Sequence, residues 1–230
     1  GRALRLDALA STHPIEVGVH NPDEIGEIFD EVSYSKGAAI IRMLAAYLGE
    51  KDFRDGLRYY LQKHSYKNTE TIHLWQAFEK VSGQPVAKIM KNWTSKPGYP
   101  VIRVSDSLIV SQDRFFASPV SKARARDKTV WQIPISFLNS KYFKLNLGDT
   151  GFYRTAYAAT LLNKLAEPIK KKTLGPRDRL GIVRDLFALA EASDISTTDA
   201  LKFLSAYKKE GNYSVWLEIA SGLARLEQLV

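Results

Sequence analysis

Side chains that could bind a metal or attack a substrate are few in this sequence, and they do not form a catalytic set. The four histidines are His13, His20, His64 and His73. No two of them have the H-x-x-x-H spacing that places two imidazoles on one helix face for zinc. Pro14 separates His13 from His20, so helical geometry cannot be assumed there. We therefore expect hydrogen-bonded or surface histidines and not zinc ligands.

Several other chemistries are excluded by composition. Cysteine is absent, so neither disulfides nor thiolate metal sites can form, which fits a reducing compartment. The sequence contains no nucleophile elbow, phosphate-binding loop or dinucleotide fingerprint. Composition and spacing alone predict a soluble, mostly helical protein made of three segments.

The net charge of +8 is concentrated in the second part of the chain. Residues 1–97 carry 13 of the 33 Lys and Arg residues and 12 of the 25 Asp and Glu residues. The excess lies mainly in residues 122–128 and 170–172, which could meet phosphates or acidic partners. No aromatic residues interleave there for base stacking. We expect solvated surface charge and no nucleic-acid partner.

A membrane partner is not expected either. No run approaches 18 uncharged apolar residues, the length needed for a transmembrane helix. The first residues, GRALRLDALASTHPIEV, lack the basic and then apolar pattern of a signal peptide.

The first segment has helical periodicity. Residues 21–24, Asn-Pro-Asp-Glu, have the composition of a helix start, and Ile25, Ile28 and Phe29 follow at i, i+3 and i+4 spacing. Ser33 is predicted to open the second helix, and glycines are predicted to end the second and fourth. The five predicted helices begin near Asn21, Ser33, Lys51, Thr71 and Val86.

The cluster Lys96-Pro97-Gly98-Tyr99-Pro100 marks a boundary, because proline and glycine break helices. After it the apolar period changes to two, which predicts short strands and a small antiparallel β-sandwich. The predicted strands are 101–104, 108–110, 130–135, 142–147 and 152–153.

Helical periodicity returns from about Thr160. Pro176 and Asp178 are typical of a helix start, as are the polar residues 196–199 and Asn212. Successive antiparallel helix pairs of this kind resemble the start of an α-solenoid.

Residues 29–38, FDEVSYSKGA, resemble the F-D-x-[IV]-S-Y-[SD]-K-G-A stretch of the zinc aminopeptidases of the gluzincin class, the aminopeptidase N and puromycin-sensitive type. These enzymes cleave single residues from peptide N-termini. The likeness to the puromycin-sensitive, cytosolic branch implies a cytoplasmic protein. Four more pieces agree in order: 8–17 (ALASTHPIEV), 92–101, 144–154 (KLNLG and GFYR) and 178–181 (DRLG).

The resemblance assigns one catalytic residue, Tyr34. In that family the matching tyrosine hydrogen-bonds the oxyanion that forms when zinc-bound water attacks the peptide carbonyl. A phenol is a directional donor that stays neutral near pH 7, and such a donor contributes roughly 3 kcal/mol in a transition state. We expect Lys36 to pair with a carboxylate and Gly37 to allow close helix packing.

The resemblance also implies a multi-domain α+β fold. Residues 1–97 would form the C-terminal helical part of a thermolysin-like catalytic domain, 98–156 an antiparallel β-sandwich domain, and 157–230 the first helices of an α-helical solenoid domain.

The family's H-E-x-x-H zinc helix, its third ligand and its G-x-M-E-N segment for the substrate amine are absent from these 230 residues. By the family's order they would precede residue 1. We therefore expect a C-terminal fragment that is inactive alone and binds no zinc, although its parent enzyme would. Its partners would be peptide substrates and the N-terminal part of the same protein.

Two other classes of function remain open. The chain could be a non-catalytic peptide-binding or scaffold module of the same fold, with helices and a basic face that hold acidic peptides. Nucleic-acid binding through the basic excess is the weakest alternative. An H-E-x-x-H segment upstream in the gene would separate the enzyme from the scaffold.

Overall fold

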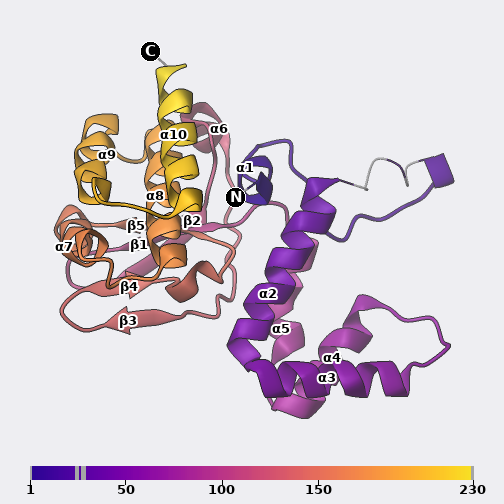
Figure 1. Cartoon of the computed structure of the whole chain (residues 1–230). Helices are drawn as coiled ribbons and strands as arrows, with labels where there is room; N and C mark the ends of the chain where they lie inside the picture. Colours follow the sequence, from indigo (N-terminus) through magenta and orange to yellow (C-terminus); the bar gives the residue numbers. More distant parts are fainter. Residues whose placement is uncertain (1, 24–25, 27–29, 229–230) are drawn as a thin grey trace.

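The computed structural model describes residues 2–23, 26 and 30–228. Figure 1 shows helices α2 to α5 gathered on one side of the molecule, and the strands with α7 to α10 on the other. The short helix α1 (Arg2–Leu6) packs against the π-helical turn η2 (Val32–Lys36), which leads directly into α2.

The helical side contains α2 (Gly37–Leu48), α3 (Glu50–Lys63), α4 (Thr71–Ser82) and α5 (Val86–Ser95). Gly49 (φ 82°) and Gly83 (φ 67°) end α2 and α4 as predicted, because a positive φ costs glycine little. The helix predicted from Asn21 lies mostly outside the described residues, although the Asn21 side chain accepts the backbone N–H of Asp23.

The predicted opening of the second helix at Ser33 is wrong in detail. Helical winding begins at Val32, and the Ser33 backbone N–H donates to the Asp30 carboxylate at 2.8 Å. The residue directly before this turn, Glu31, makes no side-chain cap, but Asp30 binds an N–H three residues ahead of it, which is the usual capping distance.

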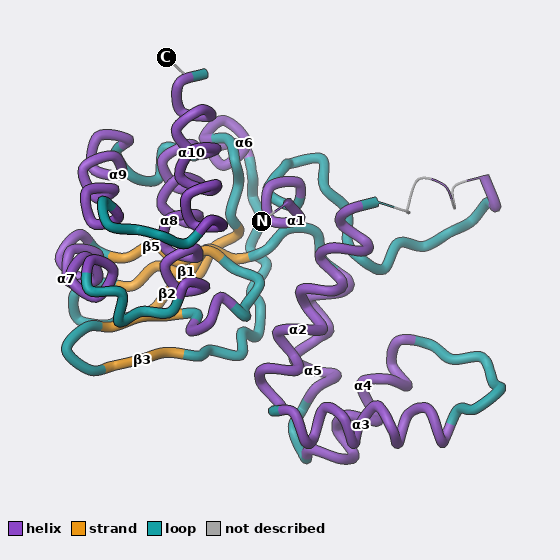
Figure 2. The backbone as a smooth tube through the Cα atoms, viewed as in Figure 1, coloured by secondary structure: helices purple, strands orange, loops and turns teal. Residues whose placement is uncertain are grey.

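The strands form two small sheets, and in Figure 2 all of them lie in the half of the molecule that contains α7 to α10. In the first sheet β1 (Pro100–Val104) lies between β2 (Val110–Arg114) and β5 (Arg154–Tyr157). In the second, β3 (Phe137–Asn139) pairs with β4 (Phe143–Leu145), and the 3₁₀ turn η3 (Leu147–Asp149) follows.

The predicted sandwich is confirmed only in part. The β1–β2 and β3–β4 pairs are antiparallel, but β1 and β5 are parallel. Residues 130–135 do not form the predicted strand, because side chains bind this backbone instead. Gln112 hydrogen-bonds both the N–H and the C=O of Trp131, and Trp93 Nε1 donates to the Gln132 carbonyl. The periodicity also did not predict a short helix, α6 (Pro119–Arg124), which lies between β2 and β3.

Four helices and one 3₁₀ turn follow in the described part of the chain: α7 (Ala159–Lys170), α8 (Pro176–Glu191), α9 (Thr197–Phe203), η4 (Leu204–Tyr207) and α10 (Tyr213–Glu227). The predicted starts are confirmed. Pro176 is the first residue of α8, Ser196 Oγ accepts the Asp199 N–H, and the Asn212 side chain accepts two N–H groups of α10. No described helix is both long enough and apolar enough to cross a membrane.

The largest buried cluster extends across the predicted boundary near residue 97. Phe78 and Trp93 of the helical side belong to it together with Tyr99, Phe115 and Phe152. A second cluster fills the space between α7, α8, α9 and α10. The division into domains at 97/98 and 156/157 stays a prediction.

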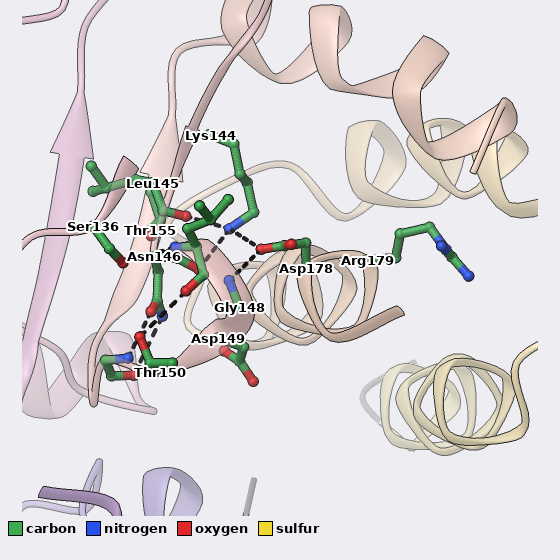
Figure 3. A network of polar contacts seen from close by, with 12 residues as sticks. Ser136, Lys144, Leu145, Asn146, Gly148, Asp149, Thr150, Thr155, Asp178 and Arg179 are labelled. Carbon is green, nitrogen blue, oxygen red and sulfur yellow. Dashed lines mark hydrogen bonds and ion pairs between the residues drawn. The ribbon is translucent and has the colours of Figure 1, made fainter. Parts of the chain in front are cut away.

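A buried polar network joins the β4–β5 connection to α8 (Figure 3). Asp178 accepts the backbone N–H of Gly148 at 2.8 Å and lies 3.7 Å from Lys144 Nζ. Burial lowers the pKa of Lys144, and nearby carboxylates such as Asp178 oppose that shift. The next residue, Arg179, points away from the network and binds Glu210 at 2.6 Å.

Candidate active site

The candidate catalytic residue, Tyr34, lies in the π-helical turn η2 with 62% of its surface exposed. Its backbone is nevertheless in a hydrogen-bonded helix. The Tyr34 N–H donates to the Asp30 carbonyl at 3.1 Å, and the Tyr34 carbonyl accepts the N–H of Gly37. The side chain therefore extends to the surface from a backbone that is held at both of its polar groups.

Two residues after Tyr34, the chain is anchored by a buried ion pair. Lys36 Nζ lies 2.9 Å from Asp7 Oδ2, and both side chains are fully buried. The same ammonium donates to the carbonyls of Lys96 and Gly98 at 3.2 and 3.0 Å. Burial lowers the pKa of Lys36, and the Asp7 carboxylate opposes that shift. The expectation that Lys36 pairs with a carboxylate is confirmed.

Asp7 has further partners that fix its position. Its Oδ1 accepts the backbone N–H of Gly98 at 2.9 Å and the Thr12 hydroxyl at 2.8 Å. The Lys36–Asp7 pair thus ties η2 both to the turn after α1 and to the segment before β1.

Ser35, the residue directly after Tyr34, is bound by a second carboxylate. The Ser35 hydroxyl donates to the carboxylate of Glu31, and Glu31 Oε1 lies 3.1 Å from Arg2 Nη1 of α1. The Arg2 side chain is largely exposed, so this ion pair contributes little by itself. It adds a second contact between α1 and the turn that carries Tyr34.

The residue directly before Tyr34 is held by Asp30, which in turn contacts His13. Asp30 Oδ1 accepts the Ser33 N–H, and Asp30 Oδ2 lies 2.7 Å from His13 Nε2. Burial raises the pKa of Asp30, but the Ser33 N–H and His13 lower it more, so the net shift is downward. Burial lowers the pKa of His13, but the Pro14 carbonyl, Asp30 and Asp7 raise it more.

The residues around Tyr34 are therefore linked to the first part of the chain through Asp30, Glu31 and Lys36. The sequence pattern identified Tyr34 and Lys36, but it did not identify Asp7, His13 or Asp30 as their supports. Asp30 could have been found, because an Asp three residues before Ser33 fits a helix cap. The contacts of Asp7 and His13 join residues far apart in sequence and leave no local signal.

The expected role of Gly37 is wrong. A Cβ built at Gly37 meets no atom within 4 Å among the described residues. Close packing occurs instead at Gly56, where a Cβ would lie 2.5 Å from the Phe78 ring between α3 and α4.

A polar cavity of about 230 Å³ lies beside the tyrosine turn, between α1, α2, η3 and α8. Ser35 and Arg42 line it from the tyrosine side, and Asp149 and Arg184 from the other. Arg42 donates to the Asp149 carbonyl at 2.6 Å, and Arg184 binds the Asp149 carboxylate at 2.9 Å. The turn that carries Tyr34 thus borders a space with an excess of guanidinium groups.

The residues that the structure describes do not fit a zinc site. Within them, no three His, Cys, Asp or Glu side chains are grouped so that they could hold a metal ion. His64 and His73 stack at 5.0 Å between ring centroids, and His73 Nδ1 accepts the Glu70 N–H at the start of α4. His13 is occupied by Pro14 and Asp30.

Comparison with known proteins gives two family matches. Residues 1–93 match the peptidase family M1 domain, and residues 142–230 match the ERAP1-like C-terminal domain. The boundary residues 94–141 lie between the two matches.

Individual relatives are similar over almost the whole chain. It is 36% identical to Aminopeptidase 2 of Candida albicans, over 98% of this chain and 27% of that protein. It is 36% identical to Tricorn protease-interacting factor F2 of Thermoplasma volcanium, over 98% and 30%. It is 34% identical to the Alanine/arginine aminopeptidase of Saccharomyces cerevisiae, over 98% and 29%. The chain therefore spans about three tenths of the length of these relatives.

Proposed function

This chain belongs to peptidase family M1, and we propose from that membership that it is part of a zinc aminopeptidase that removes N-terminal residues from peptides. Its contribution to the reaction is Tyr34, which donates a hydrogen bond to the oxygen of the scissile carbonyl as that oxygen becomes negative. The partners are peptide substrates and the rest of the parent protein. The expected location is the cytoplasm, on the resemblance to the cytosolic branch.

The observation that carries this proposal is the exposed Tyr34 side chain on a firmly held backbone. An oxyanion donor is effective when it is already oriented, because reorientation during the reaction would cost free energy. Ser33 and Ser35 bind the neighbouring carboxylates of Asp30 and Glu31, and Lys36 binds the distant Asp7, so the turn is held on both sides of Tyr34. The turn is also π-helical, and single π-helical turns occur frequently at functional sites.

Peptidases of this family use zinc, which activates water and polarises the carbonyl when it is bound. These 230 residues contain no H-E-x-x-H segment, and the described residues do not fit a zinc site, so we assign the metal and the general base to other segments of the parent. The isolated chain should bind no stoichiometric zinc and release no product from aminoacyl fluorogenic substrates. Stoichiometric zinc together with chelator-sensitive activity would contradict this assignment.

The direct test is Tyr34→Phe in the parent enzyme. The substitution removes one hydroxyl and keeps the ring, so folding and zinc content should be nearly unchanged. We expect kcat to fall at least about a hundredfold, since one oxyanion donor is lost, with little change in ground-state binding. Turnover above about a third of the wild-type value would show that Tyr34 is an ordinary surface tyrosine.

A further inference from the structure

We propose that His13 acts through Asp30 as a positioning residue for Tyr34, and that it does so only while its imidazole is protonated on both nitrogens. The inference rests on the proposed function of Tyr34. His13 contacts Asp30 and Pro14, so it acts on the reaction through the conformation of the turn η2.

The partners of the ring establish its protonation state. His13 Nδ1 lies 2.7 Å from the Pro14 carbonyl oxygen, and Nε2 lies 2.7 Å from Asp30 Oδ2. A carbonyl oxygen and a carboxylate oxygen only accept hydrogen bonds, so both ring nitrogens must donate. Only the imidazolium carries a proton on both nitrogens. A neutral ring would direct a lone pair at one of the two oxygens.

The charges around the ring favour the same state. Asp30 faces it from the start of η2, and Asp7 acts on it from the turn after α1 and is itself paired with Lys36. Together with the Pro14 carbonyl they raise the pKa of His13 above 6.5 despite its partial burial. The contact is therefore complete below pH 6.5 and is lost as the pH rises through the raised pKa of His13.

The link from His13 to Tyr34 is short. The carboxylate that His13 binds also accepts the Ser33 N–H, and the Asp30 carbonyl accepts the Tyr34 N–H at 3.1 Å. Asp30 thus holds the two backbone N–H groups at Ser33 and Tyr34. When His13 loses its proton, it loses its positive charge and one of its two hydrogen bonds. Even the tautomer that keeps the Nε2 proton on Asp30 loses the bond from Nδ1 to the Pro14 carbonyl that holds the ring, so the support of the Asp30 carboxylate weakens.

The test is the pH dependence of kcat and KM between pH 6 and 9 in the parent aminopeptidase. Wild-type kcat should fall about fivefold, since about 1 kcal/mol of support for the turn, typical of one helix cap, would be lost from the orientation of Tyr34. The midpoint should lie above pH 6.5. His13→Gln should start at that lower kcat and lack this transition. KM should change little in either case, because Tyr34 acts on the transition state. His64→Gln, at the far end of α3, is the matched control and should keep the wild-type profile.

Asp30→Asn tests the mechanism by rescue. The asparagine oxygen can still accept the Ser33 N–H, and its amide can donate to the Nε2 of a neutral His13. This variant should therefore retain kcat within about twofold while losing the transition, because its cap no longer needs the imidazolium. It also keeps the inference testable if His13→Gln does not fold, which its zinc content would reveal.

The outcomes separate the two proposals. If Tyr34→Phe retains turnover, the proposed function fails. If Tyr34→Phe is impaired but His13→Gln keeps wild-type kcat and the transition, positioning by His13 is overturned while the proposed function stands. An Asp30→Asn enzyme that still shows the transition would also overturn it, since a neutral residue 30 removes its cause.

Discussion

Removal of one partner of the buried Lys36–Asp7 pair should destabilise the chain far more than removal of an exposed pair. In Asp7→Asn the amide can still accept the Gly98 N–H and the Thr12 hydroxyl, but the Lys36 ammonium loses its counter-charge in a fully buried position. Lys36→Met instead leaves the Asp7 carboxylate unpaired. Breaking a buried pair in this way costs about 3–5 kcal/mol.

The magnitude translates into a clear experimental signal. For a chain of this size 1 kcal/mol shifts Tm by roughly 2–4 °C, so each single variant should lower Tm by about 6–20 °C. The combined variant, Asp7→Asn with Lys36→Met, has no buried charge at this position. It should cost no more than either single change, because an unpaired buried charge causes most of the loss.

The exposed pair Lys51–Asp55 in α3 is the matched control. Its atoms are 3.3 Å apart, but the Lys51 side chain is 79% exposed, so Lys51→Met should cost about 0–1 kcal/mol. Urea unfolding of all four variants, followed by tryptophan fluorescence, measures the differences. If Lys36→Met costs no more than Lys51→Met, or if the two single losses simply add, the buried pair does not anchor the tyrosine turn.

Three further expectations concern Gly222, Gly37 and Glu210. Gly222→Ala should cost about 1–3 kcal/mol by overpacking, since its Cβ would lie 2.3 Å from the buried Phe187 ring. Gly37→Ala should stabilise α2 by about 0.5–1 kcal/mol. A melting temperature equal to that of the wild-type chain would refute the expectation for that variant. The Arg179 side chain, with help from two backbone N–H groups, lowers the pKa of Glu210 to about 2. That stability is present above pH 4.5 and is lost as the pH falls toward 2, so Glu210→Gln should reduce the difference in unfolding free energy between pH 6 and pH 3 by about 2 kcal/mol. An unchanged difference would contradict the assignment.

The parts of the fold that were predictable are those fixed by local chemistry. Gly49 and Gly83 end helices because of their own φ angles, and Ser196 and Asn212 cap helices through bonds to residues two or three positions away. Segment 130–135 has the same alternation as a strand, but its backbone hydrogen bonds go to side chains of Gln112 and Trp93. Such pairings are set by tertiary position and have no periodic signature.

The candidate site likewise has some features that were predictable and others that were not. Tyr34 was identified by a contiguous motif, and the need of Lys36 for a carboxylate follows from the cost of burying an unpaired ammonium. The identity of that carboxylate was not predictable. Asp7 lies far from Lys36 in sequence, and the two meet because the chain between α1 and η2 brings them together. The parallel pairing of β1 with β5 was missed for a similar reason, since alternation does not encode strand direction.

The support of Tyr34 comes largely from the first residues of the chain. Arg2, Asp7 and His13 bind Glu31, Lys36 and Asp30, which are the residues that flank the tyrosine in sequence. Lys36 also binds the carbonyls of residues 96 and 98. The Tyr34 side chain is mostly exposed, so the conformation of the turn contributes to its direction. Substitutions within residues 2–13 should therefore act on turnover through the conformation of η2, in proportion to the number of flanking residues that they release.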